Sequence, residues 1–392
     1  GAGSRKRCLL ERFGTSKDGT LDKYVPGGDY IVIKFARWAF EKFKGAEDKL
    51  GTQMRAVGEV MSIGKTFKEA FQKAIRSLEI GRYGLGGAKD FAQKSLPELM
   101  NMLHTPSSER YFIIYEALRK GATVEDIHEI TKVKAYFLEQ LGELVEEEES
   151  IKAHAGRLPD EAMLRRAKLD GFADKYLEKL LGVPEADIRS EREKYGIVEG
   201  WEGVHASATK DAAYYFSSYN IEDKSPVNND RPKVMILGGG PNRIGQGIEF
   251  DYCCVHAALA LKSLGFETII VNCNPETVST DYDTSDKLYF EPLTLEDVLA
   301  IHAKEKPLGV IAQFGGQTPL NLADDLKKNG VNILGTTPET IDMAEDRDLF
   351  RAMMKKLGIP MPESGMAVNV EEALAIADKI GYPVMVRPSF VL

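Results

Sequence analysis

The sequence predicts a chain of mixed class, α/β plus all-α, in which a helical segment separates two α/β segments. Residues 29–78 contain two strand-like runs followed by a helical pattern. Residues 80–225 contain helical apolar stripes and no convincing strand, and residues 226–392 alternate short apolar runs with helical patterns. Because alternation of this last kind is typical of βα units, we expect a parallel sheet there with helices on both faces.

Composition and charge argue against several classes of protein. The chain has 392 residues, enough for two or three domains, and is 43% hydrophobic and 28% charged, as globular proteins are. Its formal charge of −9 argues against nucleic-acid binding. No apolar run approaches the roughly 20 residues that cross a bilayer, and no signal peptide opens the chain. The 4 cysteines form neither a disulfide framework nor a zinc-binding spacing, so we expect a cytoplasmic protein.

The first segment opens with residues 1–28, which are basic, glycine-rich and without a clear period. Apolar alternation predicts a strand at residues 29–34, and a second strand is predicted at residues 57–63. Thr66 and Glu69 have the spacing of a capping box. An amphipathic helix is expected to follow, to about residue 79, because apolar residues recur at helical spacing: Phe67, Phe71, Ala74, Ile75 and Leu78.

The second segment, residues 80–225, is predicted to be a small all-α domain. Its apolar stripes have helical spacing, and prolines and glycines divide them into short helices. The acidic run at residues 146–149 is interpreted as a solvated helix face and not as a catalytic cluster. A polar stretch with two prolines, residues 220–232, is predicted to be a linker.

The third segment carries predicted buried strands separated by helices. The strands are expected at residues 234–237, 268–272, 309–313 and 331–334. In parallel sheets, sites lie at the carboxyl ends of strands. The unusual residues of this segment stand there, in three loops: 238–247, 272–281 and 315–319.

The glycine-rich loop at residues 238–247 fits neither of two common nucleotide motifs. Arg243 stands where the dinucleotide fingerprint needs its third glycine, and Gln246 stands where a P-loop needs lysine. A glycine loop that enters a helix still offers free amides to an anion. The alternative, that the glycines only allow a tight turn, has about equal weight.

The polar loop at residues 272–281 is longer than a short strand-to-helix turn requires. A nicotinamide enzyme would place one acidic residue here for the ribose. Glu276 of this loop and Glu249, one turn into the preceding helix, could instead share a cleft, where two carboxylates suit general-base chemistry or a polar channel wall. On spacing alone, local capping or pairing of each glutamate is the favoured alternative.

Longer strings of residues resemble one family, the large subunit of carbamoyl-phosphate synthetase. The resemblance rests on five stretches, which together place residues 29–392 in the family's order: 237–252, 272–286, 313–319, 40–43 and 51–64. Residues 1–28 depart from the family's pattern and look foreign or divergent.

The resemblance implies four domains, which we expect in family order. Residues 1–78 would end the first ATP-grasp unit, the carboxyphosphate unit, and residues 79–225 would be an all-α oligomerisation domain. Residues 226–346 would be the Rossmann-like pre-ATP-grasp domain of the second, carbamoyl-phosphate half. Residues 347–392 would start the second ATP-grasp domain. The resemblance therefore implies an internal fragment that we expect to be inactive alone.

The family's reaction implies what this chain would do. The first half phosphorylates bicarbonate with ATP, ammonia from a glutaminase small subunit turns carboxyphosphate into carbamate, and a second ATP phosphorylates carbamate. The product, carbamoyl phosphate, serves arginine or pyrimidine biosynthesis. Because carbamate decomposes in water, it must travel through the protein interior. The family's tunnel positions carry over to five residues: Val57, Glu59, Gly247, Glu249 and Glu276.

The resemblance places one ATP contact, Arg387, whose guanidinium would reach the nucleotide. The alternative is an exposed strand arginine. Ligands for Mg²⁺ or Mn²⁺ are expected outside this sequence, K⁺ is a further possible ion, and no catalytic residue is predicted. Two other functions stay open: an NAD(P)-binding oxidoreductase domain on a Rossmann-like sheet, and a non-catalytic module that self-associates through its helical segment.

Overall fold

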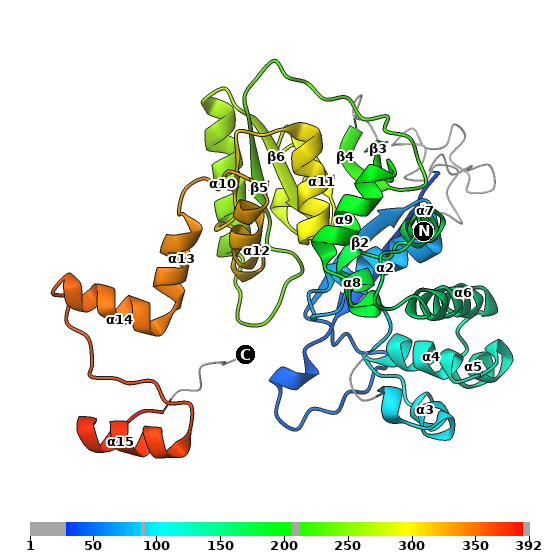
Figure 1. Ribbon diagram of the computed structural model, residues 1–392, viewed down its shortest axis with the longest axis horizontal. Helices are drawn as coiled ribbons and strands as arrows, with labels where there is room; N and C mark the ends of the chain where they lie inside the picture. Colours follow the sequence, from blue (N-terminus) through cyan, green and yellow to red (C-terminus); the bar gives the residue numbers. More distant parts are fainter. Residues whose placement is uncertain (1–28, 88–90, 206–211, 387–392) are drawn as a thin grey trace, which may run out of the picture. The chain divides into compact units, whose positions relative to one another are not determined.

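The computed structural model describes residues 29–87, 91–205 and 212–386. The chain divides into two compact units, Gly1–Asn332 and Ile333–Leu392 (Figure 1). The predicted ATP contact at Arg387 lies outside the described residues. The predicted limits of the four domains stay a prediction.

The first segment forms a two-stranded antiparallel sheet with a helix packed on it. Strand β1 (Ile31–Arg37) pairs with β2 (Gly58–Gly64), and the connection contains the short helix η2 (Phe40–Lys42). Helix α2 (Phe67–Ser77) follows, and it is buried along nearly its whole length. Both predicted strands and the predicted helix are confirmed.

The start of α2 confirms only half of the predicted capping box. The Thr66 side chain accepts a hydrogen bond from the backbone N–H of Glu69, as predicted. The Glu69 carboxylate instead accepts from the backbone N–H of Lys65 and from the hydroxyl of Ser218, both at 2.9 Å. Glu69 is therefore used for a tertiary contact with the sheet, which local spacing does not reveal.

The helical segment shares one hydrophobic core with β1 and α2. Buried side chains of that core include Phe35 and Phe71 from the first segment and Tyr115, Leu144 and Leu177 from the helices. The helices, with the short η3 (Phe91–Gln93), are α3 (Leu96–Met102), α4 (Arg110–Arg119), α5 (Val124–Thr131), α6 (Ala135–Lys152), α7 (Glu161–Leu169), α8 (Asp174–Leu181) and α9 (Glu185–Lys194).

The acidic run on α6 is not a uniformly solvated face, and the prediction is wrong for Glu148. Its side chain is fully buried and accepts hydrogen bonds from the hydroxyls of Tyr115 and Tyr176, both at 2.8 Å. The guanidinium of Arg119 lies 2.7 Å away. Position 148 continues the stripe of Leu144 by one helical turn, so it faces the core.

A six-stranded sheet forms the centre of the larger unit, in the order β3-β4-β7-β6-β5-β8. Strands β3 and β4 pair antiparallel, and the other neighbours pair in parallel. The strands are β3 (Gly200–His205), β4 (Ala212–Ser218), β5 (Lys233–Leu237), β6 (Glu267–Asn272), β7 (Lys287–Phe290) and β8 (Gly309–Ile311).

Two strand predictions are wrong in this sheet. Residues 80–225 were expected to lack strands, yet β3 and β4 lie there and extend the sheet beside β7. Residues 331–334 do not form a strand. There the backbone follows β8 only briefly, with the Val310 N–H donating to the carbonyl of Asn332 at 2.8 Å.

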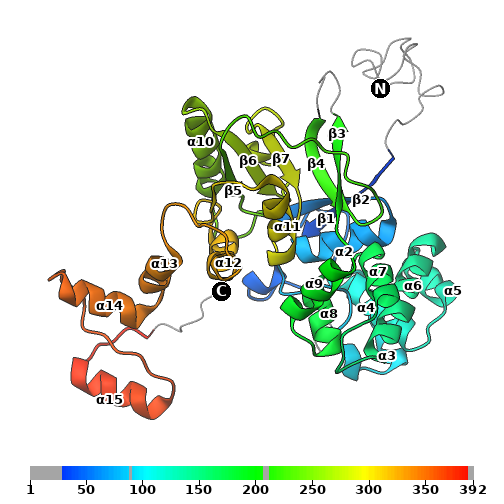
Figure 2. The ribbon, with the colours of Figure 1, turned by 45° about the horizontal axis from the view of Figure 1, so that its top comes forward.

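Helices cover both faces of the sheet, as predicted. Helix α10 (Glu249–Ser263) connects β5 to β6, and α11 (Leu295–Glu305) connects β7 to β8 in the opposite direction. Because such crossovers are right-handed, the two helices lie on opposite faces. Figure 2 shows α10 and α11 beside the strands that they connect. The sheet is followed by α12 (Gln317–Lys328), and η4 (Val278–Thr280) lies in the loop after β6.

A set of buried ion pairs, here called the ionic junction, fastens α2 and α7 to the start of α11. Each side chain in it is at most 6% exposed. The pairs are Lys73 with Glu291 (2.9 Å), Arg76 with Asp297 (3.0 Å), and Lys168 with both Asp174 (2.9 Å) and Glu296 (2.5 Å).

Within residues 333–386, the described part of the smaller unit, there are three helices: α13 (Pro338–Glu345), α14 (Arg347–Lys356) and α15 (Val370–Ile380). Helix α14 begins at Asp346, whose carboxylate accepts from the backbone N–H groups of Asp348 and Leu349.

Candidate functional site

The three predicted loops come together at the carboxyl edge of the sheet, here called the polar edge. The Gly240 N–H donates to the side chain of Asn272 at 3.0 Å. The side-chain amide of Asn274 donates to that of Asn242 at 3.1 Å. The Gln246 amide donates to the carbonyl of Gly315 at 3.3 Å. These bonds tie the loops 238–247, 272–281 and 315–319 into one surface.

Strand β2 of the first segment packs directly on the polar edge. A Cβ at Gly58 would overlap the backbone of Asn242 in the glycine loop. Farther along β2, the Met61 N–H donates to the carbonyl of Cys273 at 3.0 Å. Glycine at position 58 therefore permits a backbone approach that a larger residue would prevent.

Glu59 and Glu276 meet at this contact, together with a cation that sequence analysis did not identify. The Lys34 Nζ lies 2.7 Å from Oε1 of Glu59 and 3.2 Å from Oε1 of Glu276. Lys34 and Glu276 are 242 positions apart in the chain. The Glu59 side chain is 18% exposed and that of Glu276 is 63% exposed, so the group lies at the rim of the protein interior.

The surroundings give the two carboxyl groups different proton affinities. Burial, followed by a hydrogen bond with Glu276, raises the pKa of Glu59, although Lys34 opposes this. Hydrogen bonds with Glu59 and Lys34 lower the pKa of Glu276. As the pH falls, Glu59 therefore takes up a proton before Glu276. The carboxylate oxygens of both residues can accept hydrogen bonds from the N–H groups of a small polar molecule.

The other three predicted tunnel residues, Val57, Gly247 and Glu249, contact residues other than Lys34. The Val57 N–H donates to the carbonyl of Arg37 at 2.9 Å, and its side chain is half-buried. Gly247 is exposed, and a Cβ there would overlap the Glu249 carboxylate, which lies exposed at the start of α10. Within residues 29–87, 91–205 and 212–386, no hydrogen bond or ion pair joins Glu249 to Glu276.

Sequence analysis also missed a buried carboxylate, Glu79, beneath the glycine loop. The Thr318 hydroxyl donates to its Oε2 at 2.6 Å, and the Arg243 Nη2 lies 3.2 Å from the same oxygen. Burial raises the pKa of Glu79 to about 7, although Arg243 opposes this. Neither Glu79 nor Lys34 carries a local signal, because their partners come from segments that meet only in the folded chain.

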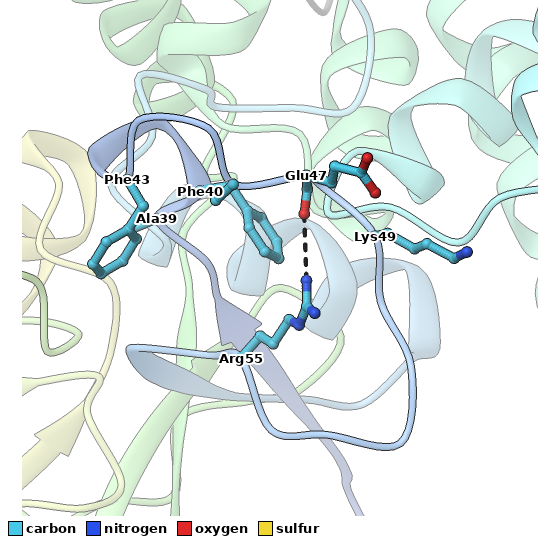
Figure 3. A pocket seen from close by; sticks show the side chains of 7 residues that line it. Ala39, Phe40, Phe43, Glu47, Lys49 and Arg55 are labelled. Atoms are coloured by element: carbon cyan, nitrogen blue, oxygen red, sulfur yellow. Dashed lines mark hydrogen bonds between the residues drawn. The ribbon is translucent and has the colours of Figure 1, made fainter.

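A cavity of about 530 Å³ lies in the connection between β1 and β2 (Figure 3). The Arg55 guanidinium donates to the backbone carbonyl of Glu47 there, at 3.4 Å. None of the predicted site residues lines the cavity. Its lining consists of Ala39, Phe40, Phe43, Ala46, Glu47, Lys49 and Arg55.

Two features are absent from the described part of the chain. It contains no group of three or more histidine, cysteine, aspartate or glutamate residues that could hold a metal ion. None of its helices has both the length and the apolar character that a membrane crossing demands.

Three family models match the chain in succession. The oligomerisation domain of the carbamoyl-phosphate synthetase large chain matches residues 59–196. The carbamoyl phosphate synthase preATP-grasp domain matches residues 230–343. The ATP binding domain of the carbamoyl-phosphate synthase L chain matches residues 346–392.

Curated relatives agree with these models. The carbamoyl phosphate synthase large chain of Archaeoglobus fulgidus is 51% identical over 380 residues, and that of Myxococcus xanthus is 52% identical over 380 residues. Each match covers 95% of this chain and 35% of the relative, so the chain spans about a third of the relatives' length.

Among solved structures, a biotin carboxylase domain of a thermophilic 2-oxoglutarate carboxylase aligns with 23% identity. The alignment covers 41% of this chain and 36% of that chain, with a TM-score of 0.30.

Proposed function

This chain belongs to the carbamoyl phosphate synthase large-chain family, and from that premise we propose that it forms the passage by which carbamate moves between the two ATP-dependent halves of a ligase. The complete ligase would make carbamoyl phosphate from bicarbonate, glutamine-derived ammonia and two ATP. This chain contributes the walls of the passage, the helical oligomerisation domain and one edge of the second ATP site.

The observation that carries the proposal is the convergence of Glu59 and Glu276 on Lys34. The first-half residues Lys34 and Glu59 lie on neighbouring strands, and Glu276 belongs to the second half. An intermediate that moves from one half to the other must cross between these segments. Because carbamate is lost in bulk water, the crossing must be sheltered and must supply hydrogen bonds in place of water.

The residues of the passage have separable tasks. Glu59 and Glu276 both accept hydrogen bonds, so their carboxylates can bind the amino group of the passing molecule. Lys34 offsets the negative charge of the two carboxylates, which would otherwise repel a carbamate anion. Gly247 leaves room at the start of α10, where Glu249 stands as the next polar group, and Val57 forms part of the wall.

ATP and Mg²⁺ serve the complete enzyme, and the ATP-binding family model covers residues 346–392. No metal-ligand set fits among the described residues, so no ligand for Mg²⁺, Mn²⁺ or K⁺ is assigned to this chain. Arg387 remains the proposed nucleotide contact. A glutaminase small subunit is the proposed ammonia source, and residues 79–225 the proposed self-association surface. The nicotinamide alternative is not favoured by the comparisons.

The test uses the complete large chain, supplied with ammonia so that no partner is needed. Each of Glu59→Ala and Glu276→Ala should raise the number of ATP molecules consumed per carbamoyl phosphate, because carbamate escapes between the two steps. Each half reaction, bicarbonate-dependent ATP hydrolysis and ATP formation from ADP and carbamoyl phosphate, should keep its wild-type rate. An unchanged ATP-to-product ratio in both variants would refute the proposed passage.

A further inference from the structure

We propose that Glu79 is a positioning residue for the passage, because it seats the glycine loop 238–247 against the end of α2. This inference rests on the proposed function, since it concerns the same passage. Glu79 does not touch the route itself. It acts through Arg243 and Gly240 on the loop that carries Gly247 and leads into Glu249.

The backbone at Glu79 is unusual. It follows α2 directly and has a φ of 55°, in the left-handed region that favours glycine. A side chain at a strained position of this kind persists when its contacts compensate for the strain. The Glu79 side chain is only 10% exposed, so it turns inward, under the glycine loop.

One carboxylate oxygen of Glu79 holds the loops together. Oε2 accepts from the Thr318 hydroxyl at 2.6 Å and lies 3.2 Å from the Arg243 guanidinium. Arg243 in turn donates from Nε to the side chain of Gln246 at 2.9 Å. A line of contacts thus runs from the end of α2 to the residue immediately before Gly247.

The other oxygen, Oε1, has no hydrogen-bond partner and is buried. It faces Gly240, where a Cβ would overlap it, and Gly240 itself has a φ of 68°. A buried oxygen without a partner destabilises the fold, so packing stability alone does not account for a carboxylate here. The glycine loop rests on Glu79 with no space between them, and the position of one fixes the position of the other.

The consequence concerns the width of the passage. Glu59 stands on β2, in the segment that ends at Glu79, whereas Gly247 and Glu249 stand on the loop that Glu79 supports. If the support is removed, the loop can shift relative to β2, and misplacement of a guiding group by about 1 Å can cost a large factor in a reaction. Leakage of carbamate follows, while the two ATP sites keep their chemistry.

The test compares variants of the complete large chain supplied with ammonia. Glu79→Ala should raise the ATP consumed per carbamoyl phosphate by about tenfold, and both half reactions should stay within about twofold of wild type. Thr318→Val, a milder change that removes the hydrogen bond to Oε2 and the hydroxyl that accepts from Arg243, should raise the ratio in the same direction by about threefold. It supplies the answer if Glu79→Ala does not fold.

Rescue and a matched control separate positioning from a general structural role. Glu79→Gln should return the ratio to within about twofold of wild type, because its oxygen can accept from Thr318 and its amide can occupy the place of the unpartnered oxygen. Lys306→Ala is the control: Lys306 also has a left-handed backbone, with a φ of 50°, but its side chain is exposed at the end of α11. It should leave the ratio unchanged.

The outcomes are distinguishable from failure of the proposed function. If Glu59→Ala raises the ratio but Glu79→Ala and Thr318→Val do not, Glu79 is not a positioning residue and the passage stands. If Glu79→Ala slows both half reactions in proportion and leaves the ratio unchanged, its role is structural only and the inference is wrong. If Glu59→Ala and Glu276→Ala also leave the ratio unchanged, the proposed function itself fails.

Discussion

Two of the contacts that residues 29–79 make with the sheet and its helices are built in opposite ways. In the ionic junction every charged side chain is at most 6% exposed and lies close to an opposite charge. At the polar edge, the Lys34 side chain is 54% exposed and that of Glu276 is 63% exposed, so their ion pair is open to solvent.

The difference indicates that the ionic junction serves mainly stability and the polar edge mainly function. Buried and paired charges fix the geometry of two segments strongly, because removal of one partner leaves an uncompensated charge in the interior. Partly exposed ion pairs add little to stability, and their carboxylates are accessible to a ligand. We therefore expect mutations in the junction to affect stability most, and mutations at the polar edge to affect coupling of the reaction.

The largest effect is expected from Lys168→Met in the ionic junction. The change leaves Asp174 and Glu296 without their shared cation, and should lower the free energy of unfolding by about 3–5 kcal/mol. Urea unfolding of this chain measures it. Lys194→Met, in an exposed pair with Glu191, is the control and should change far less. If the two variants lost equal free energies of unfolding, the ion pairs of the junction would not be shielded from water.

Acid should weaken the same junction. Burial alone would raise the pKa of Glu296, but attraction to Lys168 and Arg192 outweighs it and lowers the pKa to about 2. A lowered pKa gives stability that is present above the ordinary value of 4.5 and is lost as the pH falls towards 2. Between these pH values, wild type should lose about 3 kcal/mol more than Glu296→Gln in urea unfolding. If wild type and Glu296→Gln lost the same free energy of unfolding over this pH range, the surrounding cations would not hold Glu296 ionised.

An intermediate effect is expected where β2 meets the glycine loop. Gly58→Ala places a Cβ against the backbone of Asn242, which cannot yield easily, and should cost about 1–3 kcal/mol. Gly51→Ala is the matched control, because a Cβ there has no neighbour within 4 Å. In the complete large chain, Gly58→Ala should also raise the ATP consumed per product. If Gly51→Ala and Gly58→Ala behave alike, the close approach is absent in solution.

The smallest effect on stability is expected from Lys34→Met, because its ion pairs are largely exposed. Its electrostatic effect should nevertheless be visible. Lys34 helps to lower the pKa of Glu276, so that pKa should rise in the variant, as followed by NMR titration of the carboxyl carbons. A Glu276 titration curve identical to wild type would show that Lys34 does not reach it.

Sequence predicted the elements with strong local signals. The βα alternation, the strands at β1, β2, β5 and β6, and the three loops at the polar edge follow from apolar periodicity and glycine spacing. Strands β3 and β4 were missed, although Tyr214, Tyr215 and Phe216 favour a strand. The pairing of β4 with β7 depends on residues far along the chain, and the helical pattern of the preceding residues gives no sign of it.

The candidate site was predictable only in part. Glu276 was identified from its place in the loop after a predicted strand, and Glu59 only from a resemblance, and periodicity gave no reason to join the two. Lys34 pairs with Glu276, 242 positions away. Glu79 contacts Arg243 and Thr318, which are 164 and 239 positions away, so sequence spacing could not reveal the role of either residue. Glu148 shows the same limit, since its place in an acidic run hides its position on the buried stripe of α6.

The convergence of Lys34 and Glu276 is the central claim, and zero-length cross-linking with a carbodiimide tests it most directly. Both side chains are exposed, and the Lys34 Nζ lies 3.2 Å from the Glu276 carboxylate, so an amide can form without movement. Mass spectrometry of digested protein should find a peptide that joins β1 to the loop 272–281, and Glu276→Gln should lack it. If Lys34 cross-links only to neighbours such as Glu59 while Glu276 stays free, the two segments do not meet and the passage has no wall.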